Sequence, residues 1–296
     1  MVEEAPAIAS FGGALLVLHG DGRPPQSAAA RRLNARCLAP PHEQYGTHHS
    51  KAIIIVRPER LTVHVTTANF IFSDWLNKTN GVWSASFPRL AAPPARPAPD
   101  GFGADLLQYY EALQRLGANP PAAWIVHGPD PQDERRRWAS LDLSWVAAYD
   151  YSHAGARLVA SVPGASSGVS VGRHAGEQLD RWGHLAVRRL LAEEGLPDSF
   201  ADAALVLQFS SLSSVGNDSK WLLELTQSLC GGDRTVPPLR IVFPTRQQVG
   251  YSLEGWIAGA SIPCQAANAI KLKERLSALS GMSALARLCG WDGGAA

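Results

Sequence analysis

The chain has 296 residues, with 27 Lys and Arg against 26 Asp and Glu and a formal net charge of +1. This length is sufficient for a well-buried core or for two modest domains, and the balanced charge excludes a histone-like protein that binds nucleic acid through its overall field. Hydrophobic residues make up 46% of the chain, so we expect a folded globular protein.

The first part of the chain reads as a strand, a short helix and a β-hairpin. An apolar run predicts a strand over 14–19, and a helix is expected over 28–34. Two β-branched runs, 51–56 and 61–67, flank the turn Arg57-Pro58-Glu59-Arg60. Such runs around a proline turn predict a hairpin.

A helix and a strand are expected before the middle of the chain. The spacing of Leu and Tyr predicts a surface helix over 104–116 that ends at Gly117, and an apolar run predicts a strand over 156–162. A boundary between two halves is placed near Gly155, and a flexible loop is expected over 164–176.

Helices and strands continue to alternate in the second half, which indicates an α/β protein. Helices are expected over 182–194, from Asn217 or Asp218 to Gly231-Gly232, and over 265–279. Strands are expected over 203–209 and 239–243, and no element is predicted for 290–296.

The cysteines give no metal or disulfide pattern. The four of them form no C-x-x-C pair, so neither a zinc ribbon nor a disulfide framework is predicted and reduced intracellular thiols are expected. The N-terminus has two glutamates and a short apolar run, unlike a cationic signal peptide. No stretch approaches the roughly 20 apolar residues of a membrane span.

The hairpin carries a cluster of polar residues suited to chemistry. Residues two apart in a strand share a face, so His49 and Lys51 are expected side by side, with His48 on the other face. If residues 57 and 60 close the turn, paired positions sum to 117, and Asn69 lies opposite position 48. The side chains of His49, Lys51 and Asn69 are therefore expected to converge.

An imidazole, an ammonium and a carboxamide in one site suit nucleophilic attack on a phosphodiester. The imidazole would attack phosphorus, and the other two groups would stabilise the charge on the non-bridging oxygens. This chemistry requires no metal or cofactor. An H-x-K tripeptide arises by chance roughly 0.15 times in a chain of this composition, so a packed histidine, a snorkelling lysine and a turn asparagine are the alternative.

A family resemblance favours the catalytic interpretation. Residues 46–51 (GTHHSK), Asn69 and the run 70–83 (FIFSDWLNKTNGVW) resemble the first H-x-K motif of the tyrosyl-DNA phosphodiesterase 1 family, within the phospholipase D superfamily. Further matches follow in order along residues 14 to 263. They are LLVLHGD near the start, SFPRL at 86–90, RWGHLAVRRLL at 181–191, QFSSLSSVGNDSKWL at 208–222 and YSLEGWIAGASIP at 251–263.

The resemblance implies an enzyme that removes tyrosine and other adducts from DNA 3′ ends. His49 would be the nucleophile that forms a phosphohistidine, Lys51 and Asn69 would bind the phosphate, and Asn80 stands where the family commonly has a glutamine that supports the nucleophile. The implied partners are single- or double-stranded DNA with 3′ adducts, including a topoisomerase I-derived peptide. DNA contacts are implied for five residues, Tyr45, Ser211, Ser214, Ser261 and Pro263.

The resemblance also implies a phospholipase D-like α/β fold, with mixed sheets flanked by helices and two pseudo-symmetric halves. The first half would be 1–154 with the H-x-K motif, and the second, 155–296, would be incomplete. The family supplies a second H-x-K whose histidine acts as general acid and then base, but among the nine histidines the pattern occurs only at His49. We therefore expect a truncated, mispredicted or variant product with negligible turnover or a stalled covalent adduct.

Several alternatives remain open. A non-catalytic DNA-binding remnant is the main one, and a phospholipid-cleaving relative is less consistent with the QFSS and SLEG stretches. Two copies could also complete one site as a homodimer, although a monomer is expected. A nuclear location is implied by the family alone.

Overall fold

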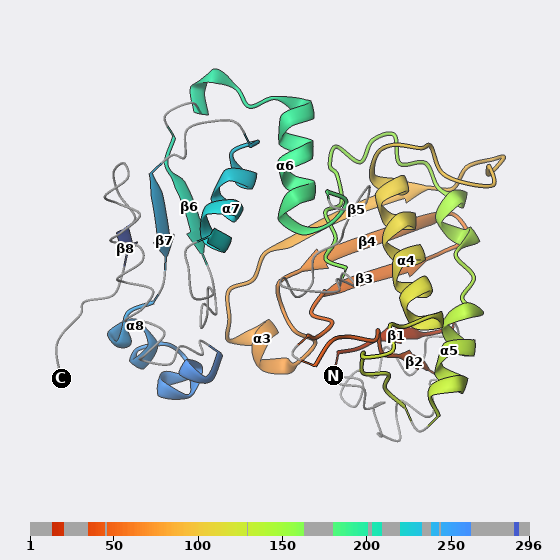
Figure 1. Cartoon of the computed structure of the whole chain (residues 1–296), viewed down its shortest axis with the longest axis horizontal. Helices are drawn as coiled ribbons and strands as arrows, with labels where there is room; N and C mark the ends of the chain where they lie inside the picture. The colour runs from red at the N-terminus through yellow and green to blue at the C-terminus, as the bar shows by residue number, and fades with distance from the viewer. Residues whose placement is uncertain are drawn as a thin grey trace. The chain divides into compact units, whose positions relative to one another are not determined.

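The computed structural model describes residues 14–20, 35–44, 46–128, 130–162, 180–200, 203–208, 220–232, 238–242, 244–261 and 287–289. The chain divides into two compact units, Met1–Gly176 and Glu177–Ala296. Each unit has its own strands and helices, which Figure 1 labels in chain order.

The main sheet of the first unit has three antiparallel strands in the order β3-β4-β5. They are β3 (Ala52–Val56), β4 (Arg60–Thr66) and β5 (Val82–Pro88). Ala52 pairs with Val65, so the paired positions of the hairpin sum to 117 and the predicted register is confirmed. Strand β5 was not predicted, although its alternation of apolar residues with serines is typical of a half-buried strand.

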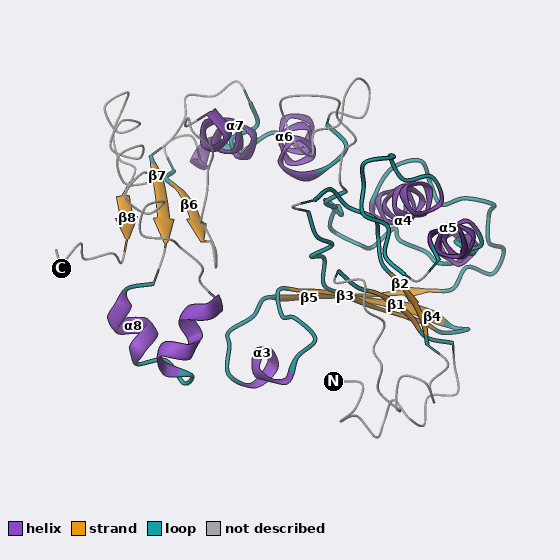
Figure 2. Cartoon of the chain, turned by 60° about the horizontal axis from the view of Figure 1, so that its bottom comes forward, coloured by secondary structure: helices purple, strands orange, loops and turns teal. Residues whose placement is uncertain are grey.

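One face of this sheet forms the core of the first unit together with helix α4 (Phe102–Ala118). Leu61, Val63 and Phe87 come from the sheet and are at most 2% exposed, and the ring of Phe102 lies 5.2 Å from that of Phe87. Each such side chain contributes about 1.5–3 kcal/mol by its burial. Figure 2 shows α4 and α5 on one side of the strands and α3 on the other.

Helix α4 confirms the predicted helix but includes Gly117, which was expected to end it. A Cβ at this position would collide with the ring of Trp138, which is fully buried in helix α5 (Pro131–Ala139). Gly117 is therefore required for the close approach of the two helices, and α4 ends at the next residue. Helix α5 begins with an N-cap in which the Asp130 side chain accepts a hydrogen bond from Gln132 N at 2.8 Å.

A second, two-stranded parallel sheet joins β1 (Leu16–Leu18) to β2 (Arg36–Leu38). Strand β1 confirms the core of the predicted strand over 14–19. Helix α5 holds β2 because Arg137 Nη2 donates to Cys37 O at 2.8 Å. The helix expected over 28–34 lies outside the described residues.

The prediction of a strand over 156–162 is wrong. Arg157 binds the Asp105 carboxylate through Nε and Nη2, at 2.8 and 2.9 Å, and Leu158 N donates to the same carboxylate at 3.0 Å. The segment is therefore tied to the first turn of α4 by a side chain instead of pairing with a strand. Before it lies a short 3₁₀ helix, η1 (Ser144–Ala148).

The second unit contains a parallel sheet in the order β6-β7-β8. Its strands are β6 (Leu205–Gln208), β7 (Leu239–Val242) and β8 (Arg287–Cys289), and helix α7 (Lys220–Leu229) lies between the first two in sequence. The predicted strands over 203–209 and 239–243 are confirmed in their central parts. A parallel pair joined through a helix is the α/β arrangement that the alternation predicted.

Helix α6 (Gly183–Glu194) confirms the helix predicted over 182–194, and Gly195, with a φ of 75°, is its C-cap as expected. Three short helices complete the unit, η3 (Asp198–Phe200), α8 (Arg246–Gly250) and η4 (Gly255–Ser261). The loop expected over 164–176, both proposed cap residues of α7, the helix over 265–279 and the segment 290–296 lie outside the described residues.

The mixed α/β class is therefore confirmed, whereas the two pseudo-symmetric halves stay a prediction.

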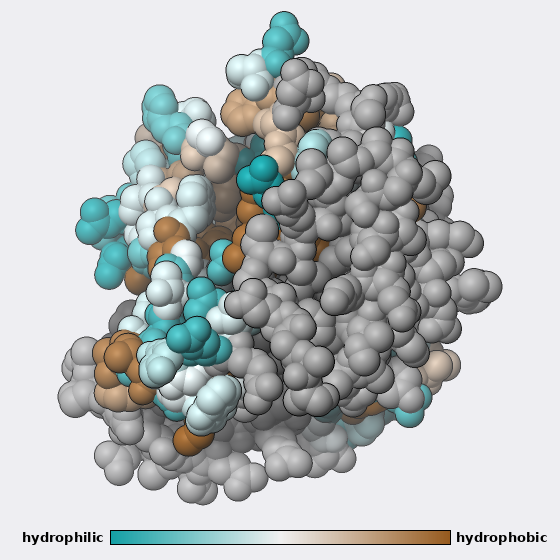
Figure 3. All heavy atoms as spheres, turned by 90° about the vertical axis from the view of Figure 1, so that its left-hand side faces the viewer, coloured by the Kyte–Doolittle hydropathy of each residue, from teal (hydrophilic) through white to brown (hydrophobic). Residues whose placement is uncertain are grey.

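Large apolar side chains reach the surface of the second unit (Figure 3), among them Tyr251, Leu253, Trp256 and Ile257. Within the part of the chain that the structure describes, every helix is too short or too polar to cross a membrane.

Candidate active site

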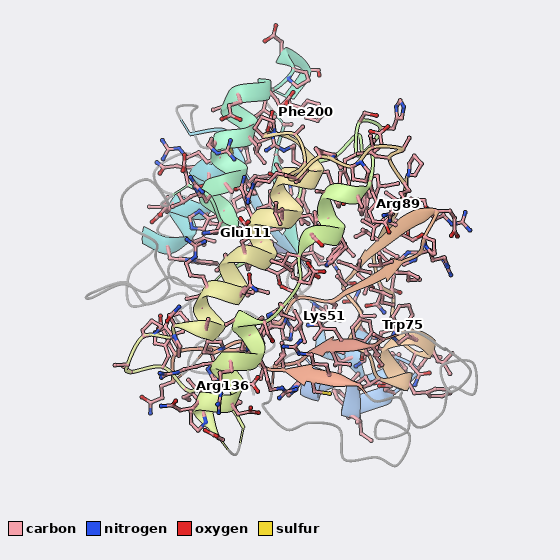
Figure 4. The ribbon with its side chains drawn as sticks, turned by 90° about the vertical axis from the view of Figure 1, so that its right-hand side faces the viewer. Lys51, Trp75, Arg89, Glu111, Arg136 and Phe200 are labelled. Carbon is pink, nitrogen blue, oxygen red and sulfur yellow. The ribbon has the colours of Figure 1, made fainter. Side chains whose placement is uncertain are left out.

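The H-x-K motif lies at the start of strand β3, where the hairpin fixes its orientation. Thr66 N donates to Lys51 O at 3.0 Å, which extends the strand pairing by one residue before Ala52, the first residue of β3. Lys51 Nζ lies 2.7 Å from His49 Nδ1 and donates to His49 O at 2.9 Å. The predicted proximity of His49 and Lys51 is therefore confirmed, and Figure 4 shows Lys51 on the first unit.

The surroundings keep both imidazoles of the motif neutral. Burial and the adjacent Lys51 ammonium lower the pKa of His49, whose side chain is nevertheless exposed. Burial, followed by Lys51, His19 and His49, lowers the pKa of His48 to about 4. Burial lowers the pKa of Lys51, and the Asp74 carboxylate opposes this effect. The exposed imidazole of His49 is therefore a neutral ring held beside a cation, an arrangement that is suited to nucleophilic attack.

The end of strand β1 packs directly against this motif. A Cβ on Gly20 would collide with His48 O and would lie 2.9 Å from Thr47 Oγ1. Thr47 Oγ1 donates to Gly20 O at 3.4 Å. A glycine is therefore needed after His19 for the two segments to approach, and this contact explains the glycine of the LHGD run.

Asn69 contacts a residue that was not predicted as part of the site. Its backbone N and its Nδ2 both donate to Asp74 Oδ2, at 2.9 and 2.7 Å. Among the described residues, the Asn69 amide has no hydrogen bond to His49 or Lys51. The expected three-way convergence is confirmed for His49 and Lys51, whereas Asn69 turns to Asp74.

Asn80 supports the loop that carries Asn69 instead of contacting His49. Its Nδ2 donates to Asp74 O at 2.6 Å, and its Oδ1 accepts from Thr67 Oγ1 at 3.0 Å. Thr67 Oγ1 in turn accepts from Gly81 N at 3.0 Å. Asn80 therefore ties the two ends of the 67–81 loop together, and any effect on His49 is indirect.

Asp74 is the centre of this loop and lies in helix α3 (Phe72–Leu76). It is 4% exposed and pairs with Lys78 Nζ at 2.9 Å. Burial alone would raise the pKa of Asp74, but hydrogen bonds from Lys78 and Asn69 lower it below its ordinary value. The one signal in the sequence was a single acidic residue within an apolar run, which is otherwise an unfavourable place for a charge.

Most of the predicted DNA contacts lie outside the described residues, namely Tyr45, Ser211, Ser214 and Pro263. Ser261 is the last residue of η4, and only its backbone is described. Within the described part of the chain, no three His, Cys, Asp or Glu side chains gather to hold a metal ion.

Comparison with known proteins extends these local observations to most of the chain. A sequence profile of the family described as tyrosyl-DNA phosphodiesterase matches residues 15–292. The chain is 36% identical over 272 residues to tyrosyl-DNA phosphodiesterase 1 of Arabidopsis thaliana, covering 87% of this chain and 40% of that protein.

Two animal proteins are more distant relatives. Identity is 26% over 267 residues to tyrosyl-DNA phosphodiesterase 1 of Drosophila melanogaster, covering 84% of this chain and 41% of that protein. It is also 26% over 230 residues to a probable tyrosyl-DNA phosphodiesterase of Caenorhabditis elegans, covering 74% and 44%. The chain thus spans about two fifths of the length of the curated relatives it matches.

Proposed function

Because the chain belongs to the tyrosyl-DNA phosphodiesterase family, we propose that it carries the nucleophilic part of a phosphodiesterase site. In this proposal His49 attacks the phosphorus of a DNA 3′-phosphotyrosyl ester, and Lys51 neutralises the non-bridging oxygens. Asn69 binds the phosphate, and Asn80 supports the loop that carries Asn69. The observation that carries the proposal is the 2.7 Å contact between Lys51 Nζ and the exposed His49 ring.

The resting hydrogen bond explains how phosphate binding could prepare the nucleophile. A protonated lysine can only donate, so the His49 Nδ1 at 2.7 Å is the acceptor and the proton of the neutral ring resides on Nε2. An anionic ester that attracts the Lys51 ammonium to its oxygens releases Nδ1. The ring can then exchange its proton between the nitrogens and present a lone pair to phosphorus.

The chemistry proceeds in two displacements. A bond forms between the His49 nitrogen and phosphorus, and the phosphorus–oxygen bond breaks with its electron pair leaving on tyrosine. A phenol with a pKa near 10 is a tolerable leaving group even without a general acid. Water then attacks the phosphohistidine, which releases a DNA 3′-phosphate and restores His49. That second step requires a base, which the family resemblance assigns to a histidine of a second motif.

The partners and the location follow from the same proposal. The substrate is DNA carrying a 3′ adduct, of which a topoisomerase I-derived tyrosyl peptide is one form, and the site of action is the nucleus. We propose that the chain acts as a monomer, since His49, Lys51 and the Asn69 loop all belong to its first unit. Cleavage of phospholipids is the less favoured chemistry.

The test is direct trapping of the intermediate. The purified chain is mixed with a single-stranded oligonucleotide that bears a 5′ label and a 3′-phosphotyrosine, quenched in alkali, and resolved on a denaturing gel. We expect a labelled band at the mass of a one-to-one protein–DNA adduct that disappears on mild acid treatment, because phosphohistidine is acid-labile. His49→Ala should give no band.

The alternative outcomes distinguish the remaining interpretations. Binding of the oligonucleotide without any adduct would favour a non-catalytic DNA-binding protein. Steady release of many equivalents of tyrosine would contradict the expectation of negligible turnover while supporting the role of His49. If the chain shows neither oligonucleotide binding nor adduct formation, the proposed function is overturned.

A further inference from the structure

The loop beside the His49–Lys51 pair is built around one buried carboxylate. Asp74 is the single charged residue of α3, and both of its oxygens are occupied. Oδ2 accepts from Asn69 N and Nδ2, and Oδ1 accepts from Lys78 Nζ. A buried carboxylate without such donors would be strongly destabilising. The two bonds from Asn69 join Asp74 to the Asn69 loop, whereas the bond from the partly exposed Lys78 adds an ion pair at the end of α3.

The carboxylate also fixes which end of the Asn69 amide faces it. The amide nitrogen donates to Asp74 Oδ2 at 2.7 Å, whereas the amide oxygen in its place would repel the carboxylate. The nitrogen carries a second N–H, which has no acceptor among the residues that the structure describes. Asn69 is thereby kept as a donor that can meet an anion, and rotation of its amide by a half-turn is prevented.

Asp74 acts on Lys51 through its charge. The partly buried ammonium of Lys51 loses hydration, and burial lowers its pKa, but the nearby Asp74 carboxylate opposes that change. Asp74 does not itself face the phosphate in this scheme, because two anions would repel. In this scheme it contacts the Asn69 amide directly and acts on Lys51 only through its charge.

We propose that Asp74 is the positioning residue of the phosphate pocket, which holds the Asn69 loop in place and orients the Asn69 amide as a donor toward the bound anion. This inference rests on the proposed function for the identity of the anion. It assigns a role to the acidic residue of the 70–83 run, which the H-x-K chemistry left unexplained.

The decisive variant is Asp74→Asn, which keeps the shape and one acceptor oxygen but removes the charge. Lys78, whose side chain is 30% exposed, can turn to solvent, so the variant leaves no buried unpaired cation. The matched controls are Lys78→Gln, which removes the ion pair of α3 but keeps the carboxylate, and Asp142→Asn, which neutralises an exposed carboxylate bonded to Ser144 N at 2.9 Å.

Two measurements are made on the full chain. The first follows the Lys51 side-chain resonances by NMR through a pH titration, together with the side-chain amide signals of Asn69. The second measures binding of a fluorescent oligonucleotide that ends in a 3′-phosphate. We expect Asp74→Asn to lower the pKa of Lys51, to shift the Asn69 amide signals, and to weaken binding about tenfold or more. Lys78→Gln and Asp142→Asn should each stay within about twofold of the original chain.

Each other outcome decides against part of the scheme. An unchanged Lys51 titration with unchanged binding in Asp74→Asn would overturn the inference. Equal losses in Asp74→Asn and Lys78→Gln would overturn it as well, because they would mean that Asp74 only anchors α3 through the ion pair. If the original chain fails to bind the 3′-phosphate, the proposed function fails, while the NMR titration still decides whether Asp74 controls Lys51 and Asn69.

Discussion

Replacing Lys51 with methionine tests the phosphate pocket most directly. Methionine matches the length of the lysine stem and keeps its packing, so the loss is limited to the ammonium. Two of the three N–H donors of Lys51 already point at His49, at 2.7 and 2.9 Å, which leaves one for a phosphate oxygen. A single hydrogen bond to a charged group contributes about 1.5–3 kcal/mol, so we expect binding of a 3′-phosphate oligonucleotide to weaken about 10- to 150-fold.

The low end of that range is the sharper expectation. If the phosphate must take a donor away from His49, part of the gain is cancelled, and the loss in Lys51→Met approaches tenfold. The assay is fluorescence anisotropy at several KCl concentrations. Each phosphate neutralised on single-stranded DNA contributes about 0.7 to the slope of log K against log salt, so Lys51→Met should reduce the slope by about that amount.

The control variant is Lys78→Met, which removes a cation that is bound to Asp74 at 2.9 Å. It should leave the slope unchanged, because that ammonium is already neutralised within the protein. Identical affinity and identical salt dependence for Lys51→Met and the original chain would refute the assignment of Lys51 to the phosphate.

Three further expectations follow. His49→Gln should abolish the covalent adduct and keep oligonucleotide binding within about threefold, as judged by alkaline gels and anisotropy. Because the pKa of His49 lies below its ordinary value, adduct formation should persist as the pH falls through about 6.5 and decline only in more acidic buffer; Lys51→Met should move this decline to higher pH, and a decline that stays in place would contradict the coupling. Gly117→Ala should lower the urea midpoint, because overpacking against Trp138 costs about 1–3 kcal/mol or more against a gain of about 1 kcal/mol in helix propensity; a stabilised variant would show that the ring can move.

Backbone periodicity made the hairpin predictable. Two β-branched runs around a proline turn define both strands and their register, and alternation of side chains then places His49 beside Lys51. The helices 104–116 and 182–194 were predictable for a similar reason, since their apolar spacing is local in the sequence. The terminal glycine was a correct signal only for the second helix, because Gly117 lies inside α4.

Side-chain partners made by tertiary contacts were not predictable in the same way. Register places the backbone of Asn69 near the motif, but the direction of its amide depends on Asp74, five residues later, and on the fold of the loop between them. Likewise, 156–162 has the composition of a strand, yet Arg157 binds Asp105 at a distance of 52 residues in the chain. No sequence pattern within either segment predicts its hydrogen-bond partner.

Residues of strand β3 and those just before it alternate between the core and the face that carries the H-x-K motif. Ile54 points to the apolar layer, while Lys51, three positions earlier, points to the opposite side. Insertion or deletion of one residue between them would turn the Lys51 ammonium toward the apolar core, whereas a change of two residues would keep it on its present face. Insertions or deletions of an odd number of residues in this short stretch are therefore excluded, even where the identity of the intervening residues can vary.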